Sequence, residues 1–294
     1  MPDEFRVVVV SDIHYASAGE KARGGYEYQA LRSWTQRVAV GLFRRWIWLK
    51  DPLAHNHQLE RFLAAAGPAD LAVANGDYSC DSAFVGLSDD AAFASARHVL
   101  ERLRERFPGR LVAGFGDHEL GKKSLFGGAG GLRLRSRERS IQELGLEDFW
   151  RRELGPWVLF GVTSSLVALP VFRPETQPEE QPEWERLREL HLKEVRDAFR
   201  SLRPGQRVVL FCHDPTALPF LWGRAGGPGS PAATRPHRDR PPAHAVDPAL
   251  EPVAGGDAGD PLAGQRRPPN EPGAQRRAML AGVRHDLMPI VERL

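Results

Sequence analysis

Short runs of apolar residues alternate along the chain with longer stretches in which apolar positions recur every three or four residues. The short runs predict buried strands, and the longer stretches predict amphipathic helices. The predicted strands cover 5–11, 71–74, 111–115, 157–163 and 208–211. The predicted helices cover 28–50, 57–66, 89–106, 138–153 and 183–202. Strands that alternate with helices predict an α/β fold rather than an all-α or all-β fold.

The pattern stops abruptly after Trp222. All 14 Phe, 4 Tyr and 7 Trp lie at or before that residue, whereas Pro, Gly, Ala and Arg dominate the remainder. A segment of that composition has too few apolar side chains to build a core. We therefore predict a folded domain over 1–222 and a low-complexity, disordered tail over 223–294, in which only 274–293 has a helical pattern.

Composition excludes several classes of protein. The net charge of +2 gives no support for nucleic-acid binding. Cys80 and Cys212 are far apart and form neither a disulfide framework nor a zinc-finger spacing, so we expect a reducing, cytoplasmic environment. The apolar run Val7–Val10 is too short for a signal peptide, and no run has the length of a transmembrane helix.

Four predicted strands are followed directly by residue types that bind metal ions. The segments are Asp12-Ile13-His14, Gly76-Asp77, Gly116-Asp117-His118-Glu119 and Cys212-His213-Asp214. Strand ends in an α/β sheet share one edge, which is where ligands bind. Carboxylate and imidazole together suit a borderline divalent ion such as Mn, Fe or Zn.

Each segment alone has an ordinary structural interpretation. Asp12 could be a cap with His14 incidental, Gly76-Asp77 is a common turn pair, and His213 could be a core histidine bonded to a backbone carbonyl. The four together, each after its own strand, are hard to explain as coincidence. The sequence therefore predicts a metal site assembled from loops.

The order of these segments resembles that of the calcineurin-like metallophosphoesterase superfamily, over about residues 5–222. That family's motifs run Asp-x-His, Gly-Asp, Gly-Asn-His-Glu, a lone His and Gly-His-x-His. The resemblance implies a four-layer αββα sandwich, two divalent metal ions and a phosphoester substrate. It also implies that a water activated between the ions attacks phosphorus.

The resemblance implies a role for six residues. Asp12 and His14 would bind the first ion, and Asp77 would bridge both ions. Asp117 and His213 would bind the second ion. His118 would lie beside the substrate, where it would stabilise the transition state or protonate the leaving group.

Two departures from the family pattern bear on activity. Asp117 stands where the family has Asn, which keeps an oxygen ligand and adds a negative charge. The closing Gly-His-x-His is absent, which would remove one ligand from each ion. Two alternatives therefore stay open: a catalytically impaired remnant that acts as a binding protein, and a nuclease of the same superfamily.

The abrupt change near residue 223 suggests a shift of reading frame in a GC-rich gene, because out-of-frame GC-rich codons encode Pro, Arg, Ala and Gly. The alternative is a genuine disordered extension. A sandwich without its late strands exposes a sheet edge, so we expect poor stability and weak or no turnover.

The DNA downstream of codon 222 tests the frameshift directly. We expect one of the other two frames to encode an apolar strand followed by Gly-His-x-His. If neither frame does so, the tail is a genuine extension.

The predicted helix 28–50 combines Trp34, Trp46 and Trp48 with five basic residues: Arg32, Arg37, Arg44, Arg45 and Lys50. Such a helix can lie at a membrane interface or cover a substrate headgroup. It can also pack on the sandwich with its arginine stems over apolar surface, and we favour this packing because tryptophan is common in core helices.

Overall fold

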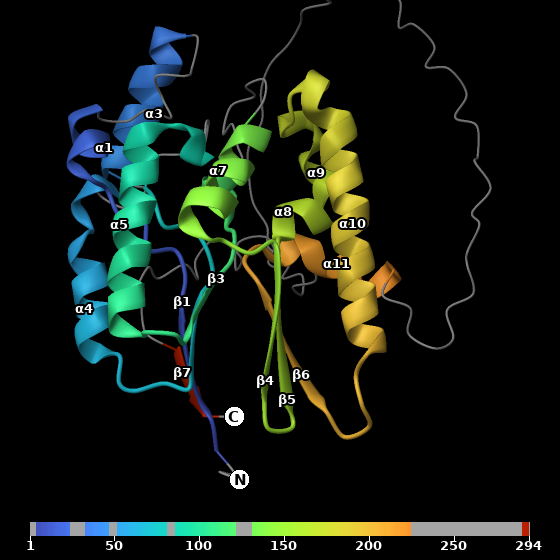
Figure 1. Cartoon of the computed structure of the whole chain (residues 1–294). Coiled ribbons are helices and arrows are strands. Elements are labelled where there is room, and N and C mark those ends of the chain that lie inside the picture. Colours follow the sequence, from blue (N-terminus) through green and yellow to red (C-terminus); the bar gives the residue numbers. More distant parts are fainter. Residues whose placement is uncertain are drawn as a thin grey trace, which may run out of the picture. The chain divides into compact units, whose positions relative to one another are not determined.

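The computed structural model describes residues 4–23, 33–46, 52–80, 86–121, 131–224 and 290–293. They belong to one compact unit, Met1–Pro228 with His285–Leu294. The described residues form a mixed α/β structure with two sheets, which confirms the predicted fold class (Figure 1). The proposed frameshifted segment lies almost wholly outside the described residues.

The first sheet has the strand order β3-β2-β1-β7. Its members are β1 (Arg6–Val10), β2 (Leu71–Ala74), β3 (Leu111–Ala113) and β7 (Ile290–Arg293). The first three are parallel, with Val7 opposite Leu71 and Ala72 opposite Leu111, and β7 runs antiparallel beside β1. The parallel arrangement brings the carboxyl ends of β1, β2 and β3 to one edge.

The second sheet has the order β4-β5-β6. Its strands are β4 (Phe149–Leu154), β5 (Trp157–Val162) and β6 (Arg207–Cys212). β4 and β5 form a hairpin, and β6 is parallel to β5. Among the described residues β6 is an edge strand, and Val208 to Phe211 are only half-buried.

Helices lie between and after these strands. They are α1 (Ala18–Arg23), α3 (Trp34–Trp46), α4 (His57–Ala65), α5 (Asp90–Arg106), α6 (Asp117–Leu120), α7 (Leu134–Leu144), α8 (Ser164–Val167), α9 (Leu169–Phe172), α10 (Gln181–Arg200) and α11 (Leu218–Arg224). None of these helices combines the length and hydrophobicity needed to cross a lipid bilayer.

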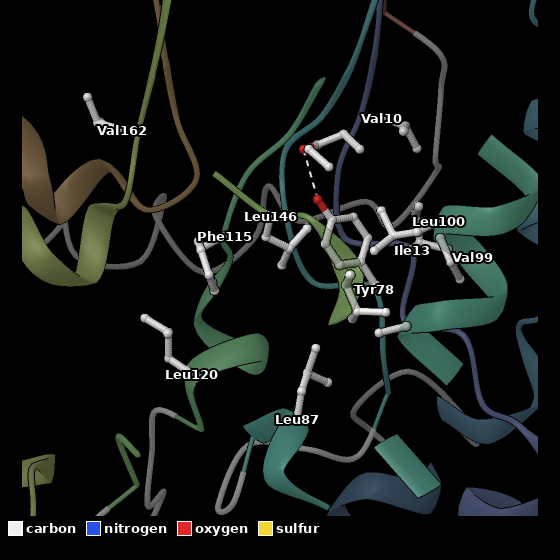
Figure 2. Close-up of a cluster of buried hydrophobic side chains, with 14 of the residues drawn as sticks. Val10, Ile13, Tyr78, Leu87, Val99, Leu100, Phe115, Leu120, Leu146 and Val162 are labelled. Carbon is white, nitrogen blue, oxygen red and sulfur yellow. Dashed lines mark hydrogen bonds between the residues drawn. The ribbon is translucent and has the colours of Figure 1, made fainter. Parts of the chain in front are cut away.

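Three apolar clusters pack the sheets and helices together. In the first, Val10 of β1 shares a cluster with Val99 and Leu100 of α5, so helices cover the outer face of the first sheet (Figure 2). In the second, Val73 of β2 meets Leu159 of β5 between the sheets. In the third, side chains of β5 pack against α10. The order helix, sheet, sheet, helix is the expected αββα arrangement.

The region around 138–153 differs from its prediction as a single helix. α7 begins at Leu134, four residues before the predicted helix, and ends at Leu144. Gly145 follows with φ of +65°, a left-handed conformation that suits glycine and terminates the helix. Residues 149–154 then form β4, in which Trp150 is buried and packs with Phe211. Tertiary pairing with β5 thus overrides the local helical pattern.

Two further predictions need correction. Residues 290–293, expected in a helical pattern over 274–293, form strand β7 instead, because they find a partner in β1. The favoured packing of the 28–50 helix is also wrong for Trp34–Trp46. Trp34 and Trp46 are 72% and 69% exposed, so they do not belong to the core. Residues 28–32 and 47–50 lie outside the described part.

His191 on α10 is a buried histidine far along the chain from the predicted metal residues. It is 3% exposed, and its Nε2 accepts a hydrogen bond from the Thr163 amide at 3.3 Å. Its Nδ1 has no hydrogen-bond partner among the residues that the structure describes. Burial lowers the pKa of His191 to about 4, with the charge of Arg137 acting in the same direction and Asp148 opposing it.

This lowered pKa predicts a specific sensitivity to acid. The unfolded chain takes up the proton near pH 6.5 and the folded chain only near pH 4, so His191 costs stability as the pH falls through this window. The full loss is about 3 kcal/mol. Replacing His191 by Gln should make unfolding by urea less dependent on pH between 7 and 4.5. Parallel losses in both proteins would contradict this assignment.

Candidate metal centre

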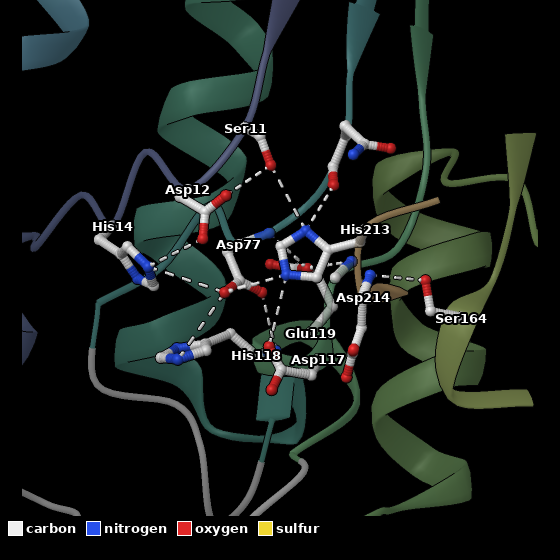
Figure 3. A network of polar contacts seen from close by, with 12 residues as sticks. Ser11, Asp12, His14, Asp77, Asp117, His118, Glu119, Ser164, His213 and Asp214 are labelled. Atoms are coloured by element: carbon white, nitrogen blue, oxygen red, sulfur yellow. Dashed lines mark hydrogen bonds and ion pairs between the residues drawn. The ribbon is translucent and has the colours of Figure 1, made fainter. Parts of the chain in front are cut away.

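Residues from both sheets meet at the carboxyl ends of the strands (Figure 3). Asp12 and His14 follow β1, and Asp77 follows β2. Asp117 and His118 begin α6 after β3, and His213 follows β6 of the second sheet. The cluster is thus built from four segments that each follow a strand, as the strand-end pattern predicts.

Asp77 lies at the centre of the cluster and is 3% exposed. Its Oδ2 is 3.3 Å from His213 Nε2, 3.7 Å from His14 Nε2 and 3.9 Å from His118 Nε2. Asp77 Oδ2 therefore faces the Nε2 atoms of three histidines, which come from three separate segments of the chain. Asp117 joins through its Oδ1, which lies 3.6 Å from His213 Nε2.

The donor atoms form two groups that share Asp77. One group is His14, Asp77 and His118, and the other is Asp12, Asp77 and His213; within each, the donor atoms lie within 4.8 Å of one another. The expected sets paired Asp12 with His14 and kept His118 for the substrate. Asp12 Oδ1 is also 3.7 Å from His14 Nε2, so the expected pair of Asp12 and His14 is close in space as well. Asp77 belongs to the site in either arrangement.

Backbone strain is concentrated on these residues. Only three non-glycine residues in the described part have positive φ: Asp12 (+56°), His14 (+47°) and Asp77 (+59°). This left-handed region is unfavourable for residues with a Cβ and persists where the surrounding structure enforces it. Such strain is typical of functional sites. Here the left-handed backbone conformation points the three side chains toward the cluster.

Two glycines allow the loops to approach closely. An added Cβ on Gly116 would lie 2.2 Å from Asp77 Oδ1, and one on Gly76 would lie 2.2 Å from the Gly116 nitrogen. Any larger residue at either position would push the loops apart. The glycines therefore serve to bring Asp77 and the start of α6 into contact.

Glu119 fixes the loop that carries Asp77 through hydrogen bonds to its backbone. It is fully buried, and its carboxylate accepts hydrogen bonds from the amides of Gly116 (2.8 Å), Asp77 (2.9 Å) and Tyr78 (2.9 Å). Asp77 Oδ1 in turn accepts from the His118 amide at 3.1 Å. Burial and the charge of Asp77 raise the pKa of Glu119, while the amide hydrogen bonds oppose that rise.

His213 is oriented by the backbone behind it. Its Nδ1 lies 2.8 Å from the carbonyl oxygen of Asn75, which can only accept, so Nδ1 carries the hydrogen. Nε2 then points to Asp77 and Asp117. A histidine whose Nδ1–H is bonded to a backbone carbonyl presents its Nε2 lone pair to a cation.

Charges in the cluster shift several pKa values. Burial lowers the pKa of His14, but Asp12 and Asp77 outweigh burial and raise that pKa to about 9. Burial raises the pKa of Asp12, but the hydrogen bond with His14 and the charge of His213 hold that pKa below its usual range. The imidazole of His14 therefore retains its proton beside these carboxylates, and a cation that binds His14 must displace that proton.

Some supporting residues were not predicted. The Ser11 hydroxyl donates to Asp12 Oδ2 at 2.6 Å and lies 3.4 Å from His213 Nδ1. Asn56 precedes α4, but its side chain makes no cap hydrogen bond to that helix. Its side chain instead exchanges two 2.8 Å hydrogen bonds with the Ala16 backbone, just after His14. The position of Ser11 beside Asp12 was the only sequence signal for either role.

The remaining histidines of the tail, His237, His244 and His285, lie outside the described residues. The structure thus brings together six predicted residues: Asp12, His14, Asp77, Asp117, His118 and His213.

Comparison with known proteins adds little to this geometry. No model of a protein family matches the sequence, and no curated protein matches it. Among solved structures, a metallophosphoesterase from Sphaerobacter thermophilus is similar over 53% of this chain, with 16% sequence identity and a TM-score of 0.22. The match spans 46% of that chain. A likeness at this level carries no argument about function, which has to come from the cluster.

Proposed function

We propose that this chain is a metal-dependent phosphoester hydrolase that holds two divalent cations around Asp77. The observation that carries the proposal is the sharing of one buried carboxylate by two groups of nitrogen and oxygen donors. The strained backbone of Asp12, His14 and Asp77 supports it, because that strain would have no purpose in an ordinary turn.

The donor chemistry fits borderline divalent ions such as Mn, Fe or Zn. Each group offers carboxylate oxygen and imidazole nitrogen, which such ions accept together. With His118 kept for the substrate, Asp12, His14 and Asp77 would hold one ion, and Asp77, Asp117 and His213 would hold the other. Each ion would then keep open positions, as ions in catalytic sites do. Two cations there would supply positive charge and Lewis acidity at a phosphoryl group.

The chain's own residues would orient and neutralise the reacting groups. The Asp77 backbone amide is bonded to Glu119, and the Asp77 carboxylate attracts the imidazoles of His14, His118 and His213 toward the centre of the cluster. His118 lies at the margin of the cluster, with its side chain 19% exposed and its ring edge-on to His14 at 4.7 Å. From there its imidazole could donate a proton to a leaving alcohol oxygen.

A screen of generic aryl phosphate monoesters and diesters tests the proposal. We expect slow hydrolysis that requires Mn²⁺ or Zn²⁺ and is lost on chelation. Replacing His118 by Asn should lower the rate by about a hundredfold or more while other cluster residues stay in place. The matched control is Asp90→Asn, a highly exposed carboxylate on α5, which should leave the rate unchanged. Hydrolysis that survives chelation would contradict the proposal.

The missing Gly-His-x-His motif favours one second candidate, a metal-binding remnant without turnover. The two candidates differ in one measurable respect. Both predict bound metal, but only the hydrolase predicts that the bound metal supports hydrolysis. A chain loaded with two ions that hydrolyses no phosphoester would favour the remnant.

A further inference from the structure

Helix α3 presents a row of large apolar side chains to solvent. Trp34, Val38, Leu42 and Trp46 follow one another at intervals of four residues, and we call them the α3 stripe. Their exposed fractions are 72%, 51%, 54% and 69%, although residues of this kind are normally buried. They account for half of the large exposed hydrophobic residues found in the described part of the chain.

The stripe faces away from the rest of the domain. Because successive residues turn by about 100°, the four positions cover an arc of roughly 120° on one side of the helix. Val40 lies opposite the centre of that arc and is buried, at 2% exposure. Residues 34–39 are all exposed, so the first half of the helix stands clear of the protein.

The charge of α3 is entirely positive. Its sequence holds Arg37, Arg44 and Arg45 and no acidic residue. Arg32 and Lys50 add positive charge on either side in the sequence. An apolar stripe on a basic helix is complementary to a surface that is apolar inside and negatively charged outside.

We propose that α3 binds in the interface of an anionic phospholipid bilayer, with the α3 stripe inserted among the acyl chains. A basic amphipathic helix with Trp and Leu on its apolar face is the type that lies in the plane of a membrane. The tryptophans at the two ends of the stripe suit the headgroup boundary, because the indole ring is apolar and its N–H is polar. Arg37 is exposed on α3, and its long side chain can place the guanidinium among the lipid phosphates. This proposal does not depend on the proposed hydrolase activity.

Sedimentation of the full chain with vesicles tests the proposal. We expect binding to vesicles of phosphatidylglycerol and phosphatidylcholine, and weak binding to phosphatidylcholine alone. The double variant Trp34→Gln and Leu42→Gln should lower the partition at least about tenfold. Arg37→Gln should weaken binding to the anionic vesicles only. Bound wild-type protein should also show a blue-shifted tryptophan emission.

The matched control is the double variant Val171→Gln and Leu190→Gln. These residues lie on α9 and α10 and are 50% and 51% exposed, so the control removes exposed apolar side chains elsewhere. It should bind vesicles as the wild type does. Circular dichroism confirms that each variant is folded, which is expected because all four positions are exposed.

Three results would overturn the proposal. The first is equal vesicle binding by the stripe variant and the control, and the second is equal binding to neutral and anionic vesicles. The third is the absence of vesicle binding. If light scattering then shows a dimer that the stripe variant abolishes, the α3 stripe binds a second copy of this chain instead.

Discussion

Replacing Asp77 by Ala should abolish metal binding and phosphoester hydrolysis together. Asp77 Oδ2 lies within 3.3–3.9 Å of the three imidazoles, and both donor groups include this carboxylate. Without it each group keeps two donors, which is too few for tight binding of a divalent ion. We expect the metal content to fall from close to two ions per chain to below one, and the rate to fall by about a thousandfold or more.

Elemental analysis and the aryl phosphate assay measure the two effects on the same preparations. Asp77→Asn provides a second variant of nearly the same shape, which retains an oxygen that can accept from the His118 amide. Asp197→Ala is the control, since Asp197 is a half-exposed carboxylate on α10 that pairs with Lys193. A variant of Asp77 that is folded and retains both ions and turnover would refute the assignment.

Replacing Glu119 by Ala should cause the largest loss of stability in the cluster. The change leaves the amides of Gly116, Asp77 and Tyr78 buried without their acceptor. A buried unsatisfied donor costs about 1–3 kcal/mol, so we expect a total loss of about 4 kcal/mol in the free energy of unfolding. The metal-free protein should be used, so that loss of metal does not contribute.

Urea unfolding of Glu119→Ala, Glu119→Gln and wild type measures this loss. The Gln variant keeps one carbonyl oxygen and should lie between the other two. Glu101→Ala removes an exposed carboxylate that pairs with Arg97 on α5, and it should cost less than about 1 kcal/mol. A Glu119→Ala variant as stable as the Glu101 control would show that this carboxylate does not hold the Asp77 loop.

Much of the fold follows from local pattern. The buried strands 71–74 and 157–162 and the helices α4, α5 and α10 lie within a few residues of their predicted positions. Strong periodicity and clear end signals, such as Pro108 after α5, make such elements readable from sequence. β4 was not readable, since its charged sequence is compatible with a helix until β5 pairs with it.

The sequence predicted which residues form the candidate site but not how they are arranged in space. Strand ends carrying Asp and His indicated Asp12, Asp77 and His213, because parallel strands bring their carboxyl ends together. The positive φ values, the Gly116–Asp77 approach and the role of Glu119 depend on tertiary contacts between loops. No local pattern encodes such contacts.

Helix α3 shows a different limit. A 3.6-residue apolar period indicates that one face of a helix avoids water, but it does not distinguish a protein core from a membrane. The sequence of Trp34–Trp46 therefore predicted burial against the sandwich, and the exposed α3 stripe shows that this inference was wrong.

The most direct test of the metal centre is a crystal of the full chain grown with Mn²⁺ or Zn²⁺, measured at the absorption edge of the metal. Two anomalous peaks that share the Asp77 carboxylate, one beside His213 and one beside His14, are the predicted result. Peaks located elsewhere, or none at this cluster in metal-saturated protein, would contradict it.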